Sequence, residues 1–318
     1  MFASALLMVR PQLFGYNPEN ADNTFARQGD HGAHQAALAE FDALAEGLRA
    51  LGLQVCVLRD SSGSPDAIFP NNWFSTHADG RLVYYPMKAP SRRREVRLDL
   101  PERLRQWGFE VKQVLDWSGL AEAGLFLEGT GSLVLDQARR LAYAALSERC
   151  DASLVTRWAE ILGYTAFCFE PCRLPGPDGQ HQPVYHTNVL MAQGQGFLVW
   201  APEGFAQAEV AQQLRQKWAD SDQFSLELSL SQVQAFAGNL LQVQTPSGPC
   251  LLMSQTAKEA LLPSQISQLE TFTAIKAFAI PTIERVGGGS LRCMLAELFL
   301  PKTEHLLAQN LFPTPVVS

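Results

Sequence analysis

The sequence predicts an α/β protein in which five similar strand-and-helix units form a five-bladed, pseudo-symmetric α/β propeller. Two observations support this prediction. Polar landmarks at Asp66, Glu128, His186, Asn239 and Cys293 are separated by 62, 58, 53 and 54 residues, a nearly constant spacing. Each landmark lies in or beside a turn between short apolar runs that are typical of strands, and a repeat of this kind marks an array of similar units.

The predicted elements follow the same order along the chain. Strands flank the landmarks in LFLEGTGSLVL (125–135) and PVYHTNVLMA (183–192), and residues 3–9 form a further buried strand. Apolar residues at three- and four-residue spacing predict amphipathic helices over residues 34–50, 92–107, 152–162 and 206–218. A short strand follows each helix, over residues 53–58, 109–115, 164–169 and 224–230. The alternative is an ordinary doubly wound sheet with interrupted strands.

Composition excludes several classes of protein. The 318 residues are 47% hydrophobic and 18% charged, which is typical of a folded chain with a large core. The net charge of -7 and a single short basic cluster, Arg92 to Arg94, argue against a nucleic-acid partner. No apolar run approaches the roughly 20 residues of a membrane-spanning helix. Without a linker, residues 1–318 are expected to form one cytoplasmic domain, with homo-oligomers possible.

The strongest chemical signal is VGGGSLRCMLAELFLP (286–301), in which three glycines precede Cys293. Glycine permits a close backbone approach, but no Gly-Lys-Ser/Thr follows, as a phosphate-binding loop would require. Cys293 is therefore a candidate nucleophile, and a simply buried cysteine is the alternative. A nucleophilic cysteine needs a proton acceptor, and His186 in YHTNVLM is the best placed of six histidines.

Glu128 interrupts an apolar stretch just before Gly129, so its carboxylate would be buried and would need a partner. It could hold a substrate nitrogen or help to transfer a proton, or it could be purely structural. A zinc site is a further alternative, with ligands Cys168, Cys172, His181 and His186. The spacing of the two cysteines and the Pro/Gly-rich loop between the pairs argue against it, so no metal and no cofactor is expected.

The five-unit pattern ending in GGGSxRC resembles the pentein superfamily of guanidine-modifying proteins. That resemblance implies the pentein fold and catalytic roles for Cys293, His186 and Glu128. Three segments also resemble dimethylarginine dimethylaminohydrolases, namely DAIFPNNWFS (66–75), APSRRREV (89–96) and ALSER (145–149). The resemblance implies that Asp66 binds the substrate amino group and that Arg92 and Arg149 bind its carboxylate.

The chain also departs from that pattern. Asn71 and Asn72 stand near the position of an aspartate that grips the guanidinium in the deiminases and dimethylarginine hydrolases, and Asn188 replaces a second aspartate after the histidine. Amides suit a neutral ureido group, because each offers donors and an acceptor. Asn17 in FGYNPEN could add another amide, and an N-terminal turn is the alternative explanation. In this respect the chain most closely resembles citrulline-utilisation hydrolases.

The predicted function is therefore cysteine-dependent hydrolysis of the ureido group of L-citrulline, giving ornithine, ammonia and carbon dioxide through a covalent adduct. The enzymatic alternatives are arginine dihydrolase, arginine deiminase and dimethylarginine dimethylaminohydrolase. A non-catalytic amino-acid-binding protein is the alternative of another class. The sequence leaves open whether the small-molecule partner, the substrate, is a free amino acid or whether the enzyme acts on an arginine within a peptide.

Overall fold

Short apolar strands form five three-stranded sheets in the part of the chain that the computed structural model describes, residues 2–29, 31–176, 179–221 and 223–303. In every one of them the middle strand runs antiparallel to the first strand and parallel to the third. The sheets are β17 (Ala296–Glu297), β1 (Ala5–Arg10) and β2 (Gln54–Arg59); β3 (Phe74–Thr76), β4 (Arg81–Tyr84) and β5 (Gln113–Asp116); β6 (Val134–Asp136), β7 (Leu141–Ala145) and β8 (Thr165–Phe169); β11 (Met191–Gly194), β12 (Phe197–Trp200) and β13 (Phe224–Glu227); and β14 (Leu241–Thr245), β15 (Gly248–Ser254) and β16 (Ala274–Phe278). A separate hairpin joins β9 (Arg173–Pro175) to β10 (His181–Pro183).

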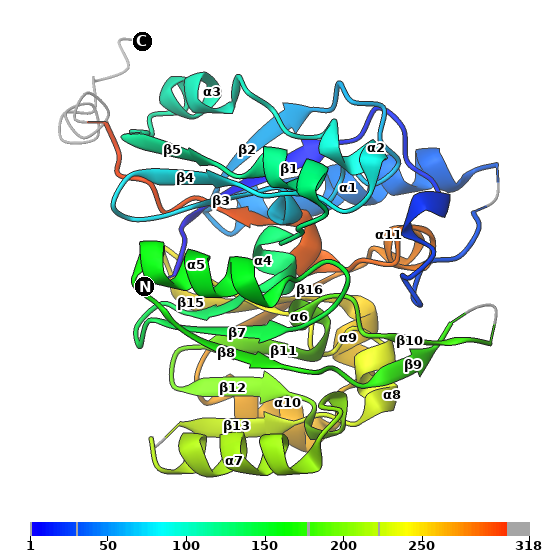
Figure 1. The fold of residues 1–318 in the computed structure, drawn as a ribbon, viewed down its shortest axis with the longest axis vertical. Helices are drawn as coiled ribbons and strands as arrows, with labels where there is room; N and C mark the ends of the chain where they lie inside the picture. The colour runs from blue at the N-terminus through cyan, green and yellow to red at the C-terminus, as the bar shows by residue number, and fades with distance from the viewer. Residues whose placement is uncertain (1, 30, 177–178, 222, 304–318) are drawn as a thin grey trace, which may run out of the picture.

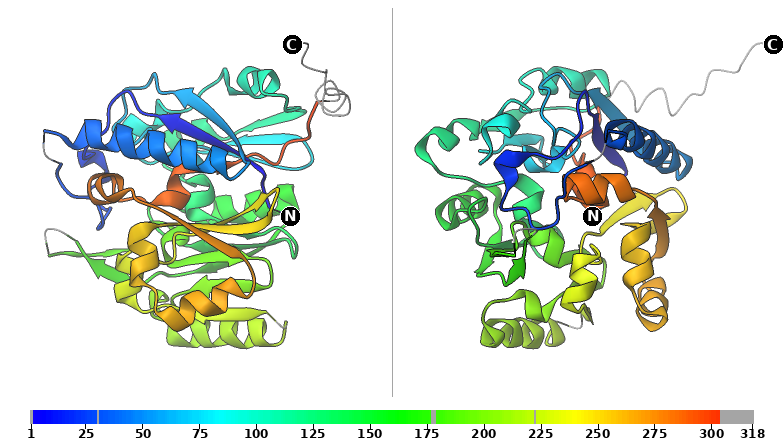
Figure 2. Two further views of the ribbon diagram at one scale, coloured as in Figure 1. Left: turned by 180° about the vertical axis from the view of Figure 1, so that it is seen from behind. Right: turned by 90° about the vertical axis from the view of Figure 1, so that its right-hand side faces the viewer.

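The first sheet combines strands from both ends of the described chain. β17 pairs antiparallel with β1, placing Glu297 opposite Leu6 and Ala296 opposite Leu7, while β2 pairs with the other edge of β1. The right-hand view of Figure 2 shows the colour running round the molecule from blue through cyan, green and yellow to orange. Five separate sheets replace the single doubly wound sheet of the alternative prediction, which is wrong.

The longer helices cover the outer sides of the sheets (Figure 1). The longer ones lie close to the predicted ranges, as with α5, where Asp151 caps the first turn by accepting hydrogen bonds from the N–H groups of Ser153 and Leu154. The described α-helices are α1 (Ala33–Ala50), α2 (Pro90–Arg93), α3 (Leu100–Gln106), α4 (Gly129–Ser132), α5 (Ala152–Leu162), α6 (Thr187–Leu190), α7 (Ala208–Ala219), α8 (Leu230–Gln234), α9 (Gln255–Ala260), α10 (Pro263–Glu270) and α11 (Pro281–Gly287).

The single helix predicted over residues 92–107 is wrong. The chain instead forms α2 and α3, and residues 94–99 between them are not helical. Pro101 has no N–H to donate and is accommodated only in a first helical turn, so a new helix begins at Leu100. The strand predicted over 109–115 likewise starts only at Gln113.

Short helical turns precede the first strand of four sheets; Cys293 lies within one of them, and Glu128 and His186 each stand immediately before another. The turns η2 (Pro70–Asn72), α4, α6 and η5 (Leu291–Met294) lead into β3, β6, β11 and β17, and contacts join α4 to η2 and α6, and η2 to η5. The apolar faces of the strands and helices pack into four buried clusters around them. Residues far apart in sequence are thereby brought to the centre of the molecule.

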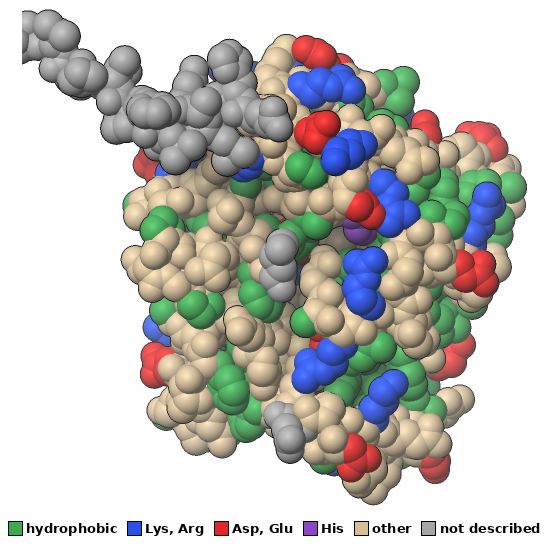
Figure 3. Space-filling view, turned by 90° about the vertical axis from the view of Figure 1, so that its left-hand side faces the viewer, with side chains coloured by type: hydrophobic (Ala, Val, Ile, Leu, Met, Phe, Trp, Pro, Cys, Tyr) green, Lys and Arg blue, Asp and Glu red, His purple; other side chains and the backbone are tan. Residues whose placement is uncertain are grey.

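The surface carries charges of both signs. On the face drawn in Figure 3, Lys and Arg side chains are interspersed with Asp and Glu side chains. Among the described residues, no helix combines the length and the apolar character needed to cross a bilayer.

Candidate active site

The central turns bring the predicted site residues around one cavity of about 260 Å³, counting the space at its mouth. Six of the ten predicted residues line it directly: Asp66, Asn72, Arg92, Arg149, His186 and Cys293. Three more do not line the cavity but contact residues that do: Glu128 contacts His186, Asn188 contacts Cys293 and Asn17 contacts Asp66. Additional lining comes from Asn20, Asn23, Phe69, Tyr185 and Gly287 to Gly289.

Cys293 is held between two amides. Its Sγ lies 3.4 Å from Nδ2 of Asn239 and 3.7 Å from Nδ2 of Asn188. The side chain is 3% exposed, and burial raises the pKa of the thiol, although the Ser290 backbone, Asn239, Arg292 and Asn188 partly oppose this effect. The resting cysteine is therefore a thiol at neutral pH, flanked by groups that can donate hydrogen bonds to a thiolate.

His186 and Glu128 form a buried pair, with Nε2 of His186 2.8 Å from Oε2 of Glu128. Burial raises the pKa of Glu128, but Arg149, His186 and Arg92 outweigh it and bring that pKa down to about 2. Burial lowers the pKa of His186 more than Glu128 raises it. A neutral imidazole that donates from Nε2 to the carboxylate leaves Nδ1 free to accept a proton.

Asn72 has a fixed orientation beside His186. Nη1 of Arg92 donates to its Oδ1 at 2.8 Å, which leaves its Nδ2 without a partner among the described residues. A Cβ at Gly131 would lie 2.3 Å from this Nδ2 and 2.8 Å from Nδ1 of His186. Only glycine fits at this point, where α4 passes the two side chains.

The two predicted carboxylate-binding arginines are already engaged. Arg92 donates from Nε and Nη2 to Glu95, and Arg149 donates from Nε and Nη2 to Asp22 at 2.9 and 2.5 Å. Nη1 of Arg149 lies 3.6 Å from Oε2 of Glu128. A substrate carboxylate would have to share or displace these contacts.

Asp66 accepts hydrogen bonds from the amides of Asn17 at 2.8 Å and Asn20 at 2.5 Å. Burial raises the pKa of its carboxyl group despite the opposing effects of Arg92 and these amides. Asn71 does not line the cavity. Its side-chain oxygen and nitrogen are buried without a partner in the described chain, while its backbone oxygen accepts a hydrogen bond from Thr130.

Besides the additional residues that line the cavity, the prediction omitted residues that hold the site in place. Asn239 contacts Cys293, and its place in the repeat at the same spacing as the other landmarks was a usable signal. The others lie in the cover segment, residues 17–26, where Asn20 contacts Asp66, Asp22 pairs with Arg149, and Asn23 donates to the backbone oxygen of Gly288. Within the described residues, no group of three or more His, Cys, Asp or Glu side chains is arranged to hold a metal ion.

A family profile described as N,N dimethylarginine dimethylhydrolase, eukaryotic, matches residues 10–300. The chain belongs to this family. It is thus a member of the pentein superfamily and a hydrolase that acts on C–N bonds. A comparison with curated proteins finds no match.

Solved structures show the same fold. The arginine dihydrolase ArgZ, from the ornithine-ammonia cycle in Cyanobacteria, is 14% identical with a TM-score of 0.68; 95% of this chain is covered, but only 41% of ArgZ. Its N-terminal domain alone, covalently bonded to a reaction intermediate, is covered over 99% of its length. A dimethylarginine dimethylaminohydrolase variant from Pseudomonas aeruginosa, complexed with citrulline, is 14% identical with a TM-score of 0.66, covering 94% of this chain and 100% of that one.

Proposed function

We propose that this protein hydrolyses the ureido group of L-citrulline to ornithine, ammonia and carbon dioxide. One observation carries the proposal. Because Arg92 holds the oxygen of Asn72, the free Nδ2 of Asn72 is the atom available beside His186. A donor at this place suits the carbonyl oxygen of a ureido group, whereas a guanidinium has only donors to offer.

The other side chains around the sulfur fit the same substrate. The groups in contact with Sγ of Cys293 are the amides of Asn188 and Asn239. The nearby carboxylate of Glu128 is neutralised by Arg149 and hydrogen-bonded to His186. A cationic guanidinium would therefore meet less negative charge here than in a site built around free carboxylates.

In the first half-reaction the Cys293 proton passes to His186, and the thiolate attacks the ureido carbon. The new S–C bond gives a tetrahedral intermediate whose oxygen accepts a hydrogen bond from Nδ2 of Asn72. The bond from carbon to the terminal nitrogen then breaks, and His186 returns the proton to the departing ammonia. Glu128 keeps the imidazole oriented through both transfers.

In the second half-reaction His186 takes a proton from water, which attacks the carbonyl carbon of the adduct. The S–C bond breaks, Cys293 recovers its proton, and the carbamate of ornithine is released and loses carbon dioxide. No external oxidant or reductant is needed. Asp66, Arg92 and Arg149 are the proposed contacts of the amino-acid end, and a charged carboxylate would compete with Asp22 for Arg149.

The test is to incubate the purified protein separately with L-citrulline, L-arginine and dimethylarginine and to identify the products by mass spectrometry. Of the three compounds, only citrulline is expected to give ornithine and ammonia. Cys293→Ser should abolish this turnover while keeping the fold. Citrulline accumulating from arginine or dimethylarginine would replace the ureido proposal by a guanidine hydrolase. Binding without turnover of any of the three would favour the non-catalytic alternative.

We also infer that the five sheets are the blades of a pseudo-symmetric propeller. Their common strand order and the closure of the first sheet by β17 support this arrangement. The landmark turns would then occupy equivalent positions around a central axis, which accounts for their convergence on one cavity.

A further inference from the structure

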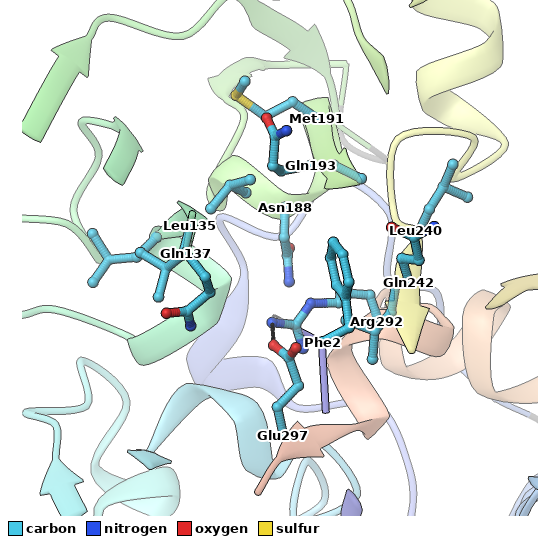
Figure 4. A pocket seen from close by; sticks show the side chains of 14 residues that line it. Phe2, Leu135, Gln137, Asn188, Met191, Gln193, Leu240, Gln242, Arg292 and Glu297 are labelled. Atoms are coloured by element: carbon cyan, nitrogen blue, oxygen red, sulfur yellow. Dashed lines mark hydrogen bonds and ion pairs between the residues drawn. The ribbon is translucent and has the colours of Figure 1, made fainter. Parts of the chain in front are cut away.

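A second cavity lies behind Cys293 and belongs to no role assigned above. This rear cavity measures about 480 Å³, counting the space open to solvent, and is lined mainly by residues at the starts of β6, β11, β14 and β17. Figure 4 shows Asn188 pointing into it, towards Arg292, with Phe2, Gln193, Gln242 and Glu297 around them.

Asn188 borders both the rear cavity and the reacting sulfur. Asn188 lines the rear cavity, and its Nδ2 lies 3.7 Å from Sγ of Cys293. The adjacent residues Arg292 and Cys293 line the rear cavity and the site cavity respectively.

The walls of the rear cavity are suited to small polar molecules. Nη2 of Arg292 donates to Glu297 at 2.9 Å. Oε1 of Gln193 and Nε2 of Gln242 are buried without a partner within the described residues. Buried amide atoms of this kind are normally satisfied by water. Neutral ammonia is similar in size and also donates and accepts hydrogen bonds, whereas an amino acid is larger and needs partners for its charged groups.

The proposed reaction creates a need for such a space. After ammonia is cleaved off, the amino-acid part remains bonded to Cys293 and fills the site cavity. Its mouth is bordered by the cover segment, where Asn20 and Asn23 hold Asp66 and Gly288. Ammonia must nevertheless leave and water must arrive before the adduct can be hydrolysed.

We propose that the rear cavity is the route by which ammonia leaves and water reaches the covalent adduct, with Asn188 as the side chain between the two cavities. This inference rests on the proposed function, since it requires an adduct that is hydrolysed after ammonia is lost. The molecules it takes are water and uncharged ammonia.

The test is to plug the rear cavity. Ala192→Phe adds a ring to a buried lining position, and Leu135→Trp adds bulk at a half-buried one that is more tolerant of substitution. In rapid-mixing experiments formation of the covalent adduct should remain fast, while the escape of ammonia and the breakdown of the adduct slow by on the order of tenfold. Intact-mass spectra should then show more adduct at steady state. Val114→Trp, at an exposed position on β5, is the matched control and should behave as wild type.

The outcomes separate this inference from the proposed substrate. If folded Leu135→Trp protein shows the adduct level and breakdown rate of wild type, the rear route is wrong. If the rates of adduct formation and adduct breakdown fall by the same factor, the substitution disturbs the active site as a whole, and the rear route is also rejected. If wild-type protein converts arginine and not citrulline, the substrate proposal fails. The rear route is then tested with the same two variants and arginine as the substrate.

Discussion

At the scale of single residues, the orientation of one amide distinguishes two classes of substrate. Asn72 presents Nδ2 because Arg92 holds its Oδ1. Asn72→Asp would keep an oxygen for Arg92 and place a second acceptor where the donor now lies. We expect kcat/KM for citrulline to fall by about 10²-fold or more, as when an oxyanion donor is lost, and binding of cationic arginine to strengthen.

Asn72→Ala is the control for this substitution. It removes the donor without adding charge, so it should lower citrulline turnover without a gain in arginine binding. Steady-state kinetics with citrulline and calorimetry with arginine measure the two effects. Unchanged citrulline turnover in Asn72→Asp would contradict the role assigned to Nδ2.

The reactivity of Cys293 should depend on pH in a defined direction. Its pKa is raised from the ordinary value of 9.0, chiefly by burial, so the thiolate fraction at neutral pH is small and grows as pH rises. Below the pKa, the rate of iodoacetamide alkylation should increase about tenfold for each pH unit. Peptide mass spectrometry can follow Cys293 separately from the other cysteines. A plateau below pH 8 would mean that the free enzyme already holds a thiolate.

At the scale of elements, Asp22 is one of the residues that fasten the cover segment. Its carboxylate pairs with Arg149 and with Lys88, and after the opposing effect of burial these cations hold its pKa well below the usual range. A depressed carboxyl pKa contributes stability that is present above the unfolded value and lost only as pH falls towards the folded one. At neutral pH the attachment is therefore complete.

Asp22→Asn should loosen the cover segment. We expect faster hydrogen exchange over residues 17–26 and a stability loss of about 1–3 kcal/mol, because Arg149 stays buried with one partner fewer. Asp42→Asn is the matched control: its ion pair with Arg10 is exposed on both sides, so its loss should cost less than about 1 kcal/mol. Equal exchange in the two variants would show that Asp22 does not hold the segment.

The sequence predicts the site residues that recur at a constant spacing. It does not predict contacts that arise only when distant segments fold together. The landmark spacing placed Glu128, His186 and Cys293 around one centre, because equivalent turns precede equivalent strands. It could not show that Arg149 is paired with Asp22, since those residues are 127 positions apart and meet only through the folded cover segment. The helix over 92–107 failed because apolar spacing outweighed Pro101 in the prediction.

At the scale of the whole molecule, closure of the first sheet depends on the segment that follows the nucleophile. β17 pairs with β1, Leu298 and Leu300 are buried in the adjoining core, and the N–H of Glu110 donates to the carbonyl of Pro301. A chain ending at Leu295 would expose β1 and lose two buried leucines, each contributing about 1.5–3 kcal/mol.

That loss is a large part of a typical stability of about 5–15 kcal/mol. Circular dichroism and size-exclusion chromatography should therefore show the chain ending at Leu295 to be unfolded or aggregated. Because Cys293 is followed so closely by β17, closure of the first sheet also fixes the position of the sulfur. If the shorter chain folded and turned over substrate at the wild-type rate, β17 would have no part in holding the site together.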